Sequence, residues 1–484
     1  MNENKEDQIY KETLNLISDL KKISIYSCDL ENPMLNLGKP THENLIRVSK
    51  LRIRKGMIGV LFNIITYFPD MIINVFKNII HHLKYIPQTK NSHASIQNSK
   101  YLFVSHFIGQ KISSDDKDSF FGDIPSLIQG KDLKITVAFV NHKKFSKIYF
   151  EDSARILLPK TCSTKERTQM IFRAIGRSLH YFGTGLKTSI SNLDKANKMF
   201  LLSRMQTNIT SFNNQILLFN LTKLVKIAEP KRVIFTLEGH PYELFLARNL
   251  ELSTIDSKMI FWQVAPVVRH QQGFLETIES LPANCEVVVT GESIRKYIIE
   301  NTSKNRKITV IGSPKFQEVS LSNKSRNSIL LAPEGSKEAV EEFVTLIPIL
   351  CKSFPDRQVI LRLHPAVNDV YTADFFLKLS DCENFEYSRS KLLDDLERAE
   401  YCVYRSSSVS VEALNHGVKP IHFSKFANSE LNPLALNNPW IFEAHDPSQL
   451  IEIISRNPLV DKDSLQVTYK KYYSKLSLEK FLQL

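Results

Sequence analysis

The sequence predicts an α/β protein with two doubly wound parallel sheets, preceded by a helical N-terminal segment. Three observations lead to this prediction. Short apolar, β-rich runs alternate with helical stretches between Tyr101 and Phe423, as in βαβ units. The runs are apolar throughout, as expected of strands buried on both faces of a parallel sheet. The alternation falls into two series that are separated near residues 267–284.

The first series predicts four strands with helices between them. A polar break at 88–99 precedes this series, and residues 164–228 contain long helical stretches. A further helix is expected over residues 240–252, directly after a strand and turn. The four strands are predicted over residues 101–108, 133–140, 231–239 and 258–266.

The second series has the same alternation and predicts a second sheet. Helices are expected over residues 293–302 and 337–354, and residues 392–417 indicate a helix, a strand, a turn and another helix. Within that segment we expect the acidic pair Asp394–Asp395 to lie on a solvated helix face. The tail from Pro447 is helical and basic. The remaining strands of this series are predicted over residues 286–291, 308–314, 328–335, 358–365 and 418–423.

Length and pattern together divide the chain into four parts. A chain of 484 residues is long enough for two to four domains of about 100–200 residues each. We expect a basic helical segment, a first Rossmann-like domain, a second Rossmann-like domain, and C-terminal helices. These parts are predicted over residues 1–95, 96–275, 276–440 and 441–484.

Composition limits the class of partner. Apolar residues make up 43% of the chain, which excludes a mainly disordered protein. The 63 basic and 51 acidic residues give a formal charge of +12, which favours an anionic partner. The lysines are spread out and no aromatic–basic module is present, so no nucleic-acid partner is predicted. The six cysteines form no CxxC pair and no zinc-like cluster, as expected of free thiols in the cytoplasm.

The stretch Met57–Ile80 is the strongest membrane signal. It is nearly long enough to span a bilayer, but Pro69 and Asp70 interrupt it. Basic residues flank it on both sides, and the N-terminus lacks the apolar core of a signal peptide. We expect a broken pair of amphipathic helices on the anionic inner face of the cytoplasmic membrane. A buried helical hairpin and a true membrane span are the alternatives.

Polar residues follow several of the predicted strands. In open parallel sheets, ligands bind outside the carboxyl ends of the strands. These positions are therefore candidate ligand contacts. They are Glu238, Gly291, Ser313, Glu334, His364 and the serines 406–408.

The second series carries the residue types that hold a phosphate. Pro365 ends a strand and fixes its turn, so that His364 is directed out of the strand end. An imidazole there can donate to a phosphate, although a bond to a backbone carbonyl is the alternative. Ser406, Ser407 and Ser408 stand where a strand passes into a helix and offer hydroxyl donors, or else simple caps. Glu412 follows them, as a ligand of ribose hydroxyls or as a surface residue.

The first series carries a candidate general base. Glu238 follows a strand, and Gly239 permits close approach of a ligand. His240 and Glu243 are neighbours that would orient an acceptor, and Asp118 lies in a loop after the first strand. A turn-and-cap motif is the alternative reading. The sequence has no GxxxxGK[ST], GxGxxG, HExxH or GxSxG motif, and no metal dependence is predicted.

These elements, taken in order, resemble one group of enzymes. Glu238–Gly239, His364–Pro365 and Ser406–Ser407–Ser408 are similar to the motifs of bacterial sialyltransferases and capsule Kdo transferases with the GT-B fold. Residues 118–128 also resemble surface-carbohydrate biosynthesis proteins. The group often has two consecutive acids before the glycine, whereas here Leu237 precedes Glu238.

The resemblance implies an inverting glycosyltransferase of capsule or lipopolysaccharide biosynthesis. Its donor would be a CMP-activated nonulosonic acid and its acceptor a glycan or lipid-linked glycan, with no other cofactor. It implies that Glu238 is the base and that His364 stabilises the leaving phosphate, so both are predicted as catalytic residues. Asp118, Gly239, His240 and Glu243 are predicted at the acceptor. The alternatives are a CDP-glycerol-type polyol phosphotransferase, a UDP- or GDP-sugar transferase, and a non-enzymatic glycan-assembly scaffold. The implied donor-binding residues are Gly291, Ser313, Glu334, His364, Pro365, Ser406, Ser407, Ser408 and Glu412.

Overall fold

The computed structural model describes most of the chain from residue 56 onwards. The predicted N-terminal helical segment is therefore described only over its last part, and the basic residues between Lys50 and Lys55 lie outside the described residues. The described residues are 56–84, 96, 98–107, 118–131, 133–141, 155–158, 163–207, 209–251, 256–268, 272–303, 306–321, 326–365, 367, 379, 381–424, 432–436 and 442–484.

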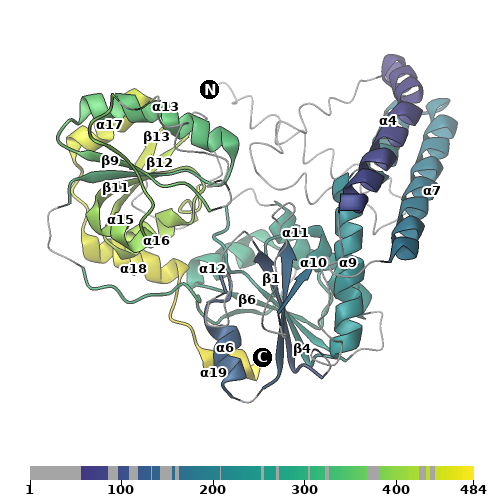
Figure 1. The fold of residues 1–484 in the computed structure, drawn as a ribbon, viewed down its shortest axis with the longest axis horizontal. Helices are drawn as coiled ribbons and strands as arrows, with labels where there is room; N and C mark the ends of the chain where they lie inside the picture. The colour runs from purple at the N-terminus through teal and green to yellow at the C-terminus, as the bar shows by residue number, and fades with distance from the viewer. Residues whose placement is uncertain are drawn as a thin grey trace. The chain divides into compact units, whose positions relative to one another are not determined.

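The chain forms two compact units (Figure 1). The first comprises residues 1–107, 111–261 and 271–286. The second comprises residues 108–110, 262–270 and 287–484.

The first sheet has seven strands in the order β3-β2-β1-β4-β5-β6-β7. The order reverses direction between β1 and β4, two neighbouring parallel strands. Every residue of β1 is buried, as the unbroken apolar run predicts. The strands are β1 (Tyr101–Phe107), β2 (Ile135–Asn141), β3 (Arg155–Leu158), β4 (Arg232–Thr236), β5 (Lys258–Trp262), β6 (Cys285–Val289) and β7 (Ile308–Val310).

Helices of the first unit pack beside this sheet and beside one another. Helix α7 begins with a capping box, in which Ser163 and Glu166 satisfy each other's backbone N–H groups. The long helical region predicted over residues 164–228 forms three helices, α7, α8 and α9. The helices are α4 (Gly56–Lys84), α6 (Ile124–Gln129), α7 (Thr164–Ser189), α8 (Leu193–Gln206), α9 (Ile209–Ala228), α10 (Pro241–Glu251) and α11 (Gln272–Ser280).

The predicted break at Pro69 is wrong, because α4 is one continuous helix of 29 residues. Neighbouring helices hold α4 through hydrogen bonds from Asn63 to Asn197 and between Tyr67 and Ser178. A proline removes one helical hydrogen bond, and these tertiary contacts offset that loss.

The second sheet has six strands in the order β10-β9-β8-β11-β12-β13, with parallel pairing between neighbours. Its order reverses between β8 and β11. Together the two sheets confirm the predicted fold class, two Rossmann-like doubly wound sheets. The assignment of the strands at 286–291 and 308–314 to the second sheet is wrong, because they form β6 and β7 at the edge of the first sheet. The strands are β8 (Ser328–Ala332), β9 (Gln358–Leu361), β10 (Phe385–Tyr387), β11 (Ala399–Tyr404), β12 (Lys419–Phe423) and β13 (Phe442–Ala444).

A continuous apolar core holds the second sheet against its helices. Phe343 and Ile347 on α13 pack on Leu331, Leu361 and Val403 of the central strands, all of them fully buried. The helices of this unit are α12 (Glu292–Asn301), α13 (Lys337–Ser353), α15 (Leu392–Arg398), α16 (Val409–Asn415), α17 (Pro447–Arg456), α18 (Lys462–Tyr472) and α19 (Leu478–Gln483).

Candidate functional site

Polar side chains meet at the carboxyl ends of β1 and β4, where the first sheet reverses direction. His106 is near the end of β1, and Thr236 is the last residue of β4. The His106 Nε2 atom lies 2.8 Å from the Thr236 hydroxyl and 3.3 Å from the Tyr242 hydroxyl. Such reversal points are where doubly wound sheets bind ligands. We call His106, Glu238 and His240 the first-sheet cluster.

The turn that presents Glu238 is built by the residues around it. Gly239 has a φ of +79°, a conformation that favours glycine over residues with a Cβ atom. The buried Glu243 carboxylate accepts the backbone N–H groups of Glu238 at 3.1 Å and of Gly239 at 2.9 Å. Glu243, in the first turn of α10, therefore stabilises the turn that carries Glu238.

The first-sheet cluster joins one carboxylate and two imidazoles. The Glu238 Oε2 atom lies 3.2 Å from His240 Nε2, and both side chains are partly exposed. The ring centres of His106 and His240 are 5.2 Å apart. One ligand atom from each of the three residues lies within 4.8 Å of the other two, an arrangement that can hold a divalent cation.

Asp118 lies beside this cluster. Its Oδ1 atom accepts hydrogen bonds from the Ser105 hydroxyl at 2.9 Å and from the N–H groups of Phe120 and Phe121 at 2.8 and 2.7 Å. Its Oδ2 atom is buried and has no hydrogen-bond partner among the described residues. Burial raises the pKa of Asp118, and its hydrogen bonds lower it in part.

The second sheet places a buried ion pair at its own reversal point. Arg405, the residue after β11, donates from Nε to Glu334 at 2.9 Å and from Nη1 to Glu342 at 3.0 Å. The Arg405 guanidinium also donates to Ser336, at 3.1 Å. Glu334 follows β8, so the pair links the carboxyl ends of two neighbouring strands. Glu334 was predicted as a site residue, but its partner Arg405 was not, because the sequence does not show which arginines are buried in ion pairs.

His364 is the polar residue at the end of β9. Burial lowers the pKa of His364, Lys315 lowers it further, and Glu334 raises it in part. The imidazole is therefore neutral near pH 7. Lys315 belongs to the loop after β7, where its backbone N–H donates to the Ser313 hydroxyl at 3.1 Å. The lysine was not predicted as a site residue.

Glu412, on α16, lies in the same electrostatic neighbourhood. Burial raises the pKa of Glu412, and the positive charges of Lys315 and Arg362 lower it in part. The positive charge of Lys315 thus lowers the pKa of both His364 and Glu412. We call Lys315, His364 and Glu412 the second-sheet cluster.

The three serines follow β11 and precede α16, as predicted. The buried Ser407 hydroxyl accepts the N–H of Val409 at 3.4 Å. Ser408 is the first flanking residue of α16 but makes no side-chain capping bond. Within the described part of the chain, the hydroxyls of Ser406 and Ser408 make no hydrogen bond.

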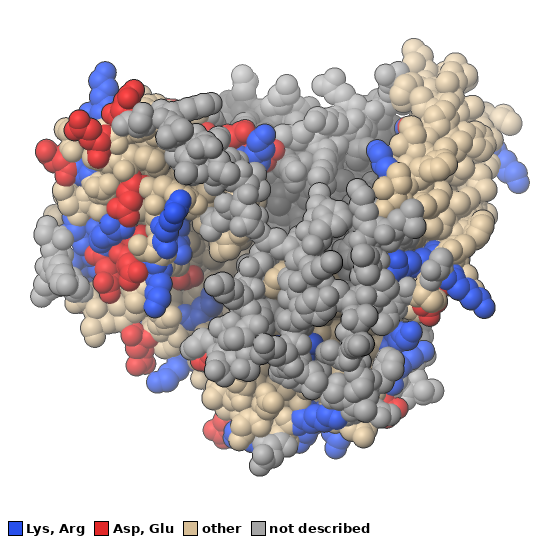
Figure 2. Space-filling model, viewed as in Figure 1, with Lys and Arg blue, Asp and Glu red and all other residues tan. Residues whose placement is uncertain are grey.

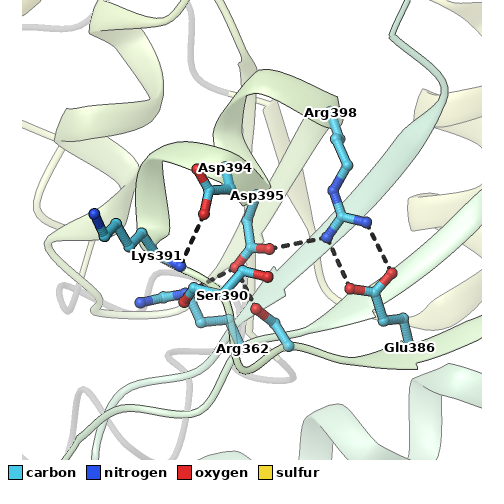
Figure 3. A network of polar contacts seen from close by, with 8 residues as sticks. Arg362, Glu386, Ser390, Lys391, Asp394, Asp395 and Arg398 are labelled. Carbon is cyan, nitrogen blue, oxygen red and sulfur yellow. Dashed lines mark hydrogen bonds and ion pairs between the residues drawn. The ribbon is translucent and has the colours of Figure 1, made fainter.

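A charged network fixes the strand end that carries His364 (Figure 3). The Asp395 carboxylate, fully buried, accepts from Arg362 at 2.8 Å and from Arg398 at 3.0 Å. Arg398 also binds Glu386 through two bonds of 2.8 Å. The prediction of a solvated face is therefore wrong for Asp395, because its carboxylate anchors Arg362, two residues before His364.

Gly291 and Ser313 lie where the C-terminal segment crosses the ends of β6 and β7. A Cβ atom on Gly291 would come within 2.4 Å of the carbonyls of Lys471 and Tyr472. Ser313 donates its backbone N–H to Ser474 at 3.0 Å. Gly291 is therefore required because α18 packs too closely for a side chain at this position. Ser313 stabilises the loop of Lys315 by accepting the Lys315 N–H.

Neither a protein-family model nor a curated protein sequence matches this chain. Solved structures are similar at low identity. The UDP-GlcNAc 2-epimerase of Methanocaldococcus jannaschii, in complex with UDP-GlcNAc and UDP, is 12% identical, with coverage of 76% of this chain and 97% of that chain and a TM-score of 0.44. The S. aureus MnaA–UDP co-structure is 9% identical, with coverage of 79% and 95% and a TM-score of 0.48.

The glycosyltransferase SnogD from Streptomyces nogalater is also similar, with 11% identity, coverage of 78% and 96%, and a TM-score of 0.39. At these levels of similarity, the ligands of those proteins carry no argument about the ligand of this chain.

Proposed function

We propose that the protein is a glycosyltransferase that moves a nonulosonic acid from a CMP-activated donor to a hydroxyl of a surface glycan. The observation that carries the proposal is the order of strand ends in the second sheet: His364 follows β9 and the serines follow β11, on either side of β8 at one carboxyl edge. Glu412 lies on the helix after the serines, and the charge of Lys315 acts on the pKa of both His364 and Glu412. A cation, hydroxyl donors and a carboxylate are the groups that a nucleotide's phosphate and ribose require.

Each residue of the donor site has a distinct role in this proposal. The Lys315 ammonium offsets the charge of the phosphate, and the hydroxyls of Ser406 and Ser408 donate to its oxygens. A neutral imidazole on His364 donates one further N–H, held in place by the turn at Pro365. The Glu412 carboxylate accepts the ribose hydroxyls. Glu334 binds Arg405, and this ion pair links the ends of β8 and β11. Glu334 therefore positions these two strand ends in the proposed donor site.

The proposed reaction uses these donor-site groups together with Glu238 of the first-sheet cluster. Glu238 takes the proton of the acceptor hydroxyl, and the acceptor oxygen forms a bond with the anomeric carbon of the donor. The bond between that carbon and the phosphate oxygen breaks, and its electron pair leaves with CMP. Lys315 and the serine hydroxyls stabilise the charge that develops on the phosphate. This single displacement inverts the anomeric configuration.

A panel of nucleotides tests the proposal. Calorimetric titration of the full chain with CMP, CDP, UMP, UDP and GDP should give the tightest binding with CMP. The variant Lys315→Ala should weaken CMP binding at least tenfold, because it removes a charged phosphate contact of about 1.5–3 kcal/mol. Lys296→Ala is the matched control, since Lys296 is an exposed lysine of the same unit.

The alternatives have their own outcomes in this experiment. Selectivity for CDP over CMP would favour a CDP-glycerol-type polyol phosphotransferase, and tighter binding of UDP or GDP would favour a transferase of those sugars. Binding of no nucleotide would contradict the enzymatic proposal and leave a glycan-assembly scaffold.

A further inference from the structure

Helix α4 is amphipathic, and its polar side faces the protein. Asn63 donates to the Asn197 side chain at 3.0 Å, and the Tyr67 hydroxyl lies 2.8 Å from the Ser178 hydroxyl. Asp70 pairs with Arg204 at 3.2 Å. These residues recur at intervals of three and four, so they form one side of the helix. They hold α4 against α7 and α8.

The opposite side of α4 is apolar and exposed. The protein-facing side also buries Val60 and Tyr67 against Phe182 and Phe200, so α4 has apolar residues on both sides. A helix of a soluble protein normally keeps its outer side polar. The segment Met57–Lys77 has the length and composition of a membrane span, and only 17% of its most apolar stretch is buried in the protein. This argues against the buried hairpin. The exposed fractions are 57% for Met57, 74% for Ile58, 53% for Leu61, 72% for Ile65, 49% for Phe68, 50% for Ile72, 60% for Phe76 and 51% for Ile80.

Helix α7 adds a second uncharged stripe. Phe172, Leu179 and Leu186 are 68%, 42% and 38% exposed and recur every seven residues on one side of the helix. Gly176 and Gly183 fall between them and face open space. The two helices pack directly, since the ring of Tyr67 on α4 stacks on Phe182 of α7 at 3.9 Å. Figure 2 shows the surface over α4 and α7 as mostly uncharged.

The charges around this surface are predominantly positive. Helices α4, α7 and α8 together carry ten lysines and arginines but only three acids. Each of the three acids is paired with a basic residue: Asp70 with Arg204, Glu166 with Lys223 and Asp194 with Lys198. An apolar face surrounded by net positive charge is complementary to a bilayer with anionic headgroups.

We propose that the exposed faces of α4 and α7 form a docking surface for an anionic lipid bilayer, with α4 in the plane of the interface. An in-plane position leaves the polar side of α4 on α7 and α8, where its hydrogen bonds are made. A membrane span would bring Asp70 and Asn63 into the hydrocarbon. The inference does not depend on the proposed function, because it rests on different residues.

Vesicle sedimentation of the full chain tests this proposal. Vesicles of phosphatidylcholine with about 30% phosphatidylglycerol should bind the protein, and pure phosphatidylcholine should bind it at least tenfold more weakly. The double variant Ile65→Asp/Phe76→Asp should lose at least tenfold in binding, and Phe172→Ser/Leu179→Ser should also weaken it. Leu459→Asp is the matched control, since Leu459 is 97% exposed in the other unit.

Four results would overturn the proposal. The first is equal binding by the α4 double variant while circular dichroism shows an unchanged fold. The second is equal binding to vesicles with and without anionic lipid. The third is membrane-bound protein that resists alkaline carbonate extraction, which would indicate a span. The fourth is a wild-type chain that ignores vesicles but forms dimers that the double variant does not form, which would make a second copy the occupant.

Discussion

The carboxylate of Glu243 accepts the backbone N–H of Gly239 at 2.9 Å, and this bond shapes the turn that carries the proposed base. Glu243 is fully buried and also accepts the N–H of Glu238. Gly239 is buried, so its N–H group depends on this carboxylate as an acceptor. Glu243 is therefore a positioning residue for Glu238.

Replacing Glu243 should separate positioning from chemistry. We expect Glu243→Ala to lower the free energy of unfolding by about 1–3 kcal/mol, because buried N–H groups lose their acceptor. Turnover should fall as well, since the turn no longer holds Glu238. Glu243→Gln keeps one acceptor oxygen and should recover part of both quantities. Urea unfolding and initial rates measure the two effects, and an Ala variant with unchanged stability would contradict this role.

Replacing the proposed base should affect turnover alone. We expect Glu238→Gln to lower kcat on the order of a hundredfold or more, because the amide cannot take the acceptor proton. Stability and CMP binding should stay at wild-type values, since the side chain is partly exposed and its backbone is held by Glu243. Glu341→Gln, an exposed carboxylate on α13, serves as the control. Near-normal turnover in Glu238→Gln would refute the assignment.

The first-sheet cluster also predicts a response to metal ions. If Glu238 is a base and not a permanent ligand, incubation with EDTA should leave turnover unchanged. Added Zn²⁺ should inhibit, because His106, Glu238 and His240 lie within 4.8 Å of one another and would bind it together. The variant His106→Gln should be less sensitive to Zn²⁺. Loss of activity in EDTA with recovery in a divalent cation would instead assign the cluster as a functional metal site.

Nucleotide binding should depend on pH through Glu412. Burial raises the pKa of its carboxyl group, so protonation begins at a higher pH than for an ordinary glutamate. A protonated Glu412 loses one acceptor for the ribose hydroxyls. We therefore expect the acid-side loss of CMP binding to begin at a higher pH than an ordinary glutamate would give, and Glu412→Gln to bind more weakly at every pH with a flatter profile. Calorimetry between pH 8 and 5.5 measures this, and an unchanged profile in the variant would exclude Glu412.

The sequence predicted the fold well where strands are long and buried. Unbroken apolar runs such as that of β1 identified the central strands, and alternation with helices implied parallel sheets. The edge strands β3, β10 and β13, of three or four residues each, were missed. So short a run has no period to distinguish it from a loop. The strands β7 and β9 are as short, but they were predicted from longer runs over residues 308–314 and 358–365.

The candidate sites were predicted only in part, because sequence shows residue types and not their partners. Glu238 and His364 follow strands, and that position identified them. His106 lies within an apolar strand, and Lys315 is one lysine among many, so neither had a signal of its own. Asp395 is buried with Arg362 and Arg398, whereas helical periodicity placed it in solvent. Such pairings depend on which strand ends the topology brings together.

Stability should fall in mildly acidic solution through His422, on β12. Burial lowers the pKa of His422 to about 4, His445 and the Arg405 charge lower it further, and a backbone hydrogen bond with Arg405 raises it in part. Between pH 6.5 and about 4 the unfolded chain binds a proton at this histidine that the folded chain does not bind, so the unfolded state gains as the pH falls. The lost stability amounts to roughly 3 kcal/mol at most, at about 1.4 kcal/mol for each pH unit.

The variant His422→Phe should remove this contribution, because phenylalanine keeps a ring beside Tyr404 and does not titrate. Urea unfolding at pH 7.5 and 4.5 measures the difference. We expect the free energy of unfolding to fall less for the variant than for the wild type between pH 7.5 and pH 4.5. Carboxylates contribute equally to both proteins, so their effect cancels in this comparison. His180→Gln is the control, since His180 is exposed on α7 and should change nothing. Equal losses in wild type and His422→Phe would show that His422 is protonated in the folded protein as readily as in the unfolded chain.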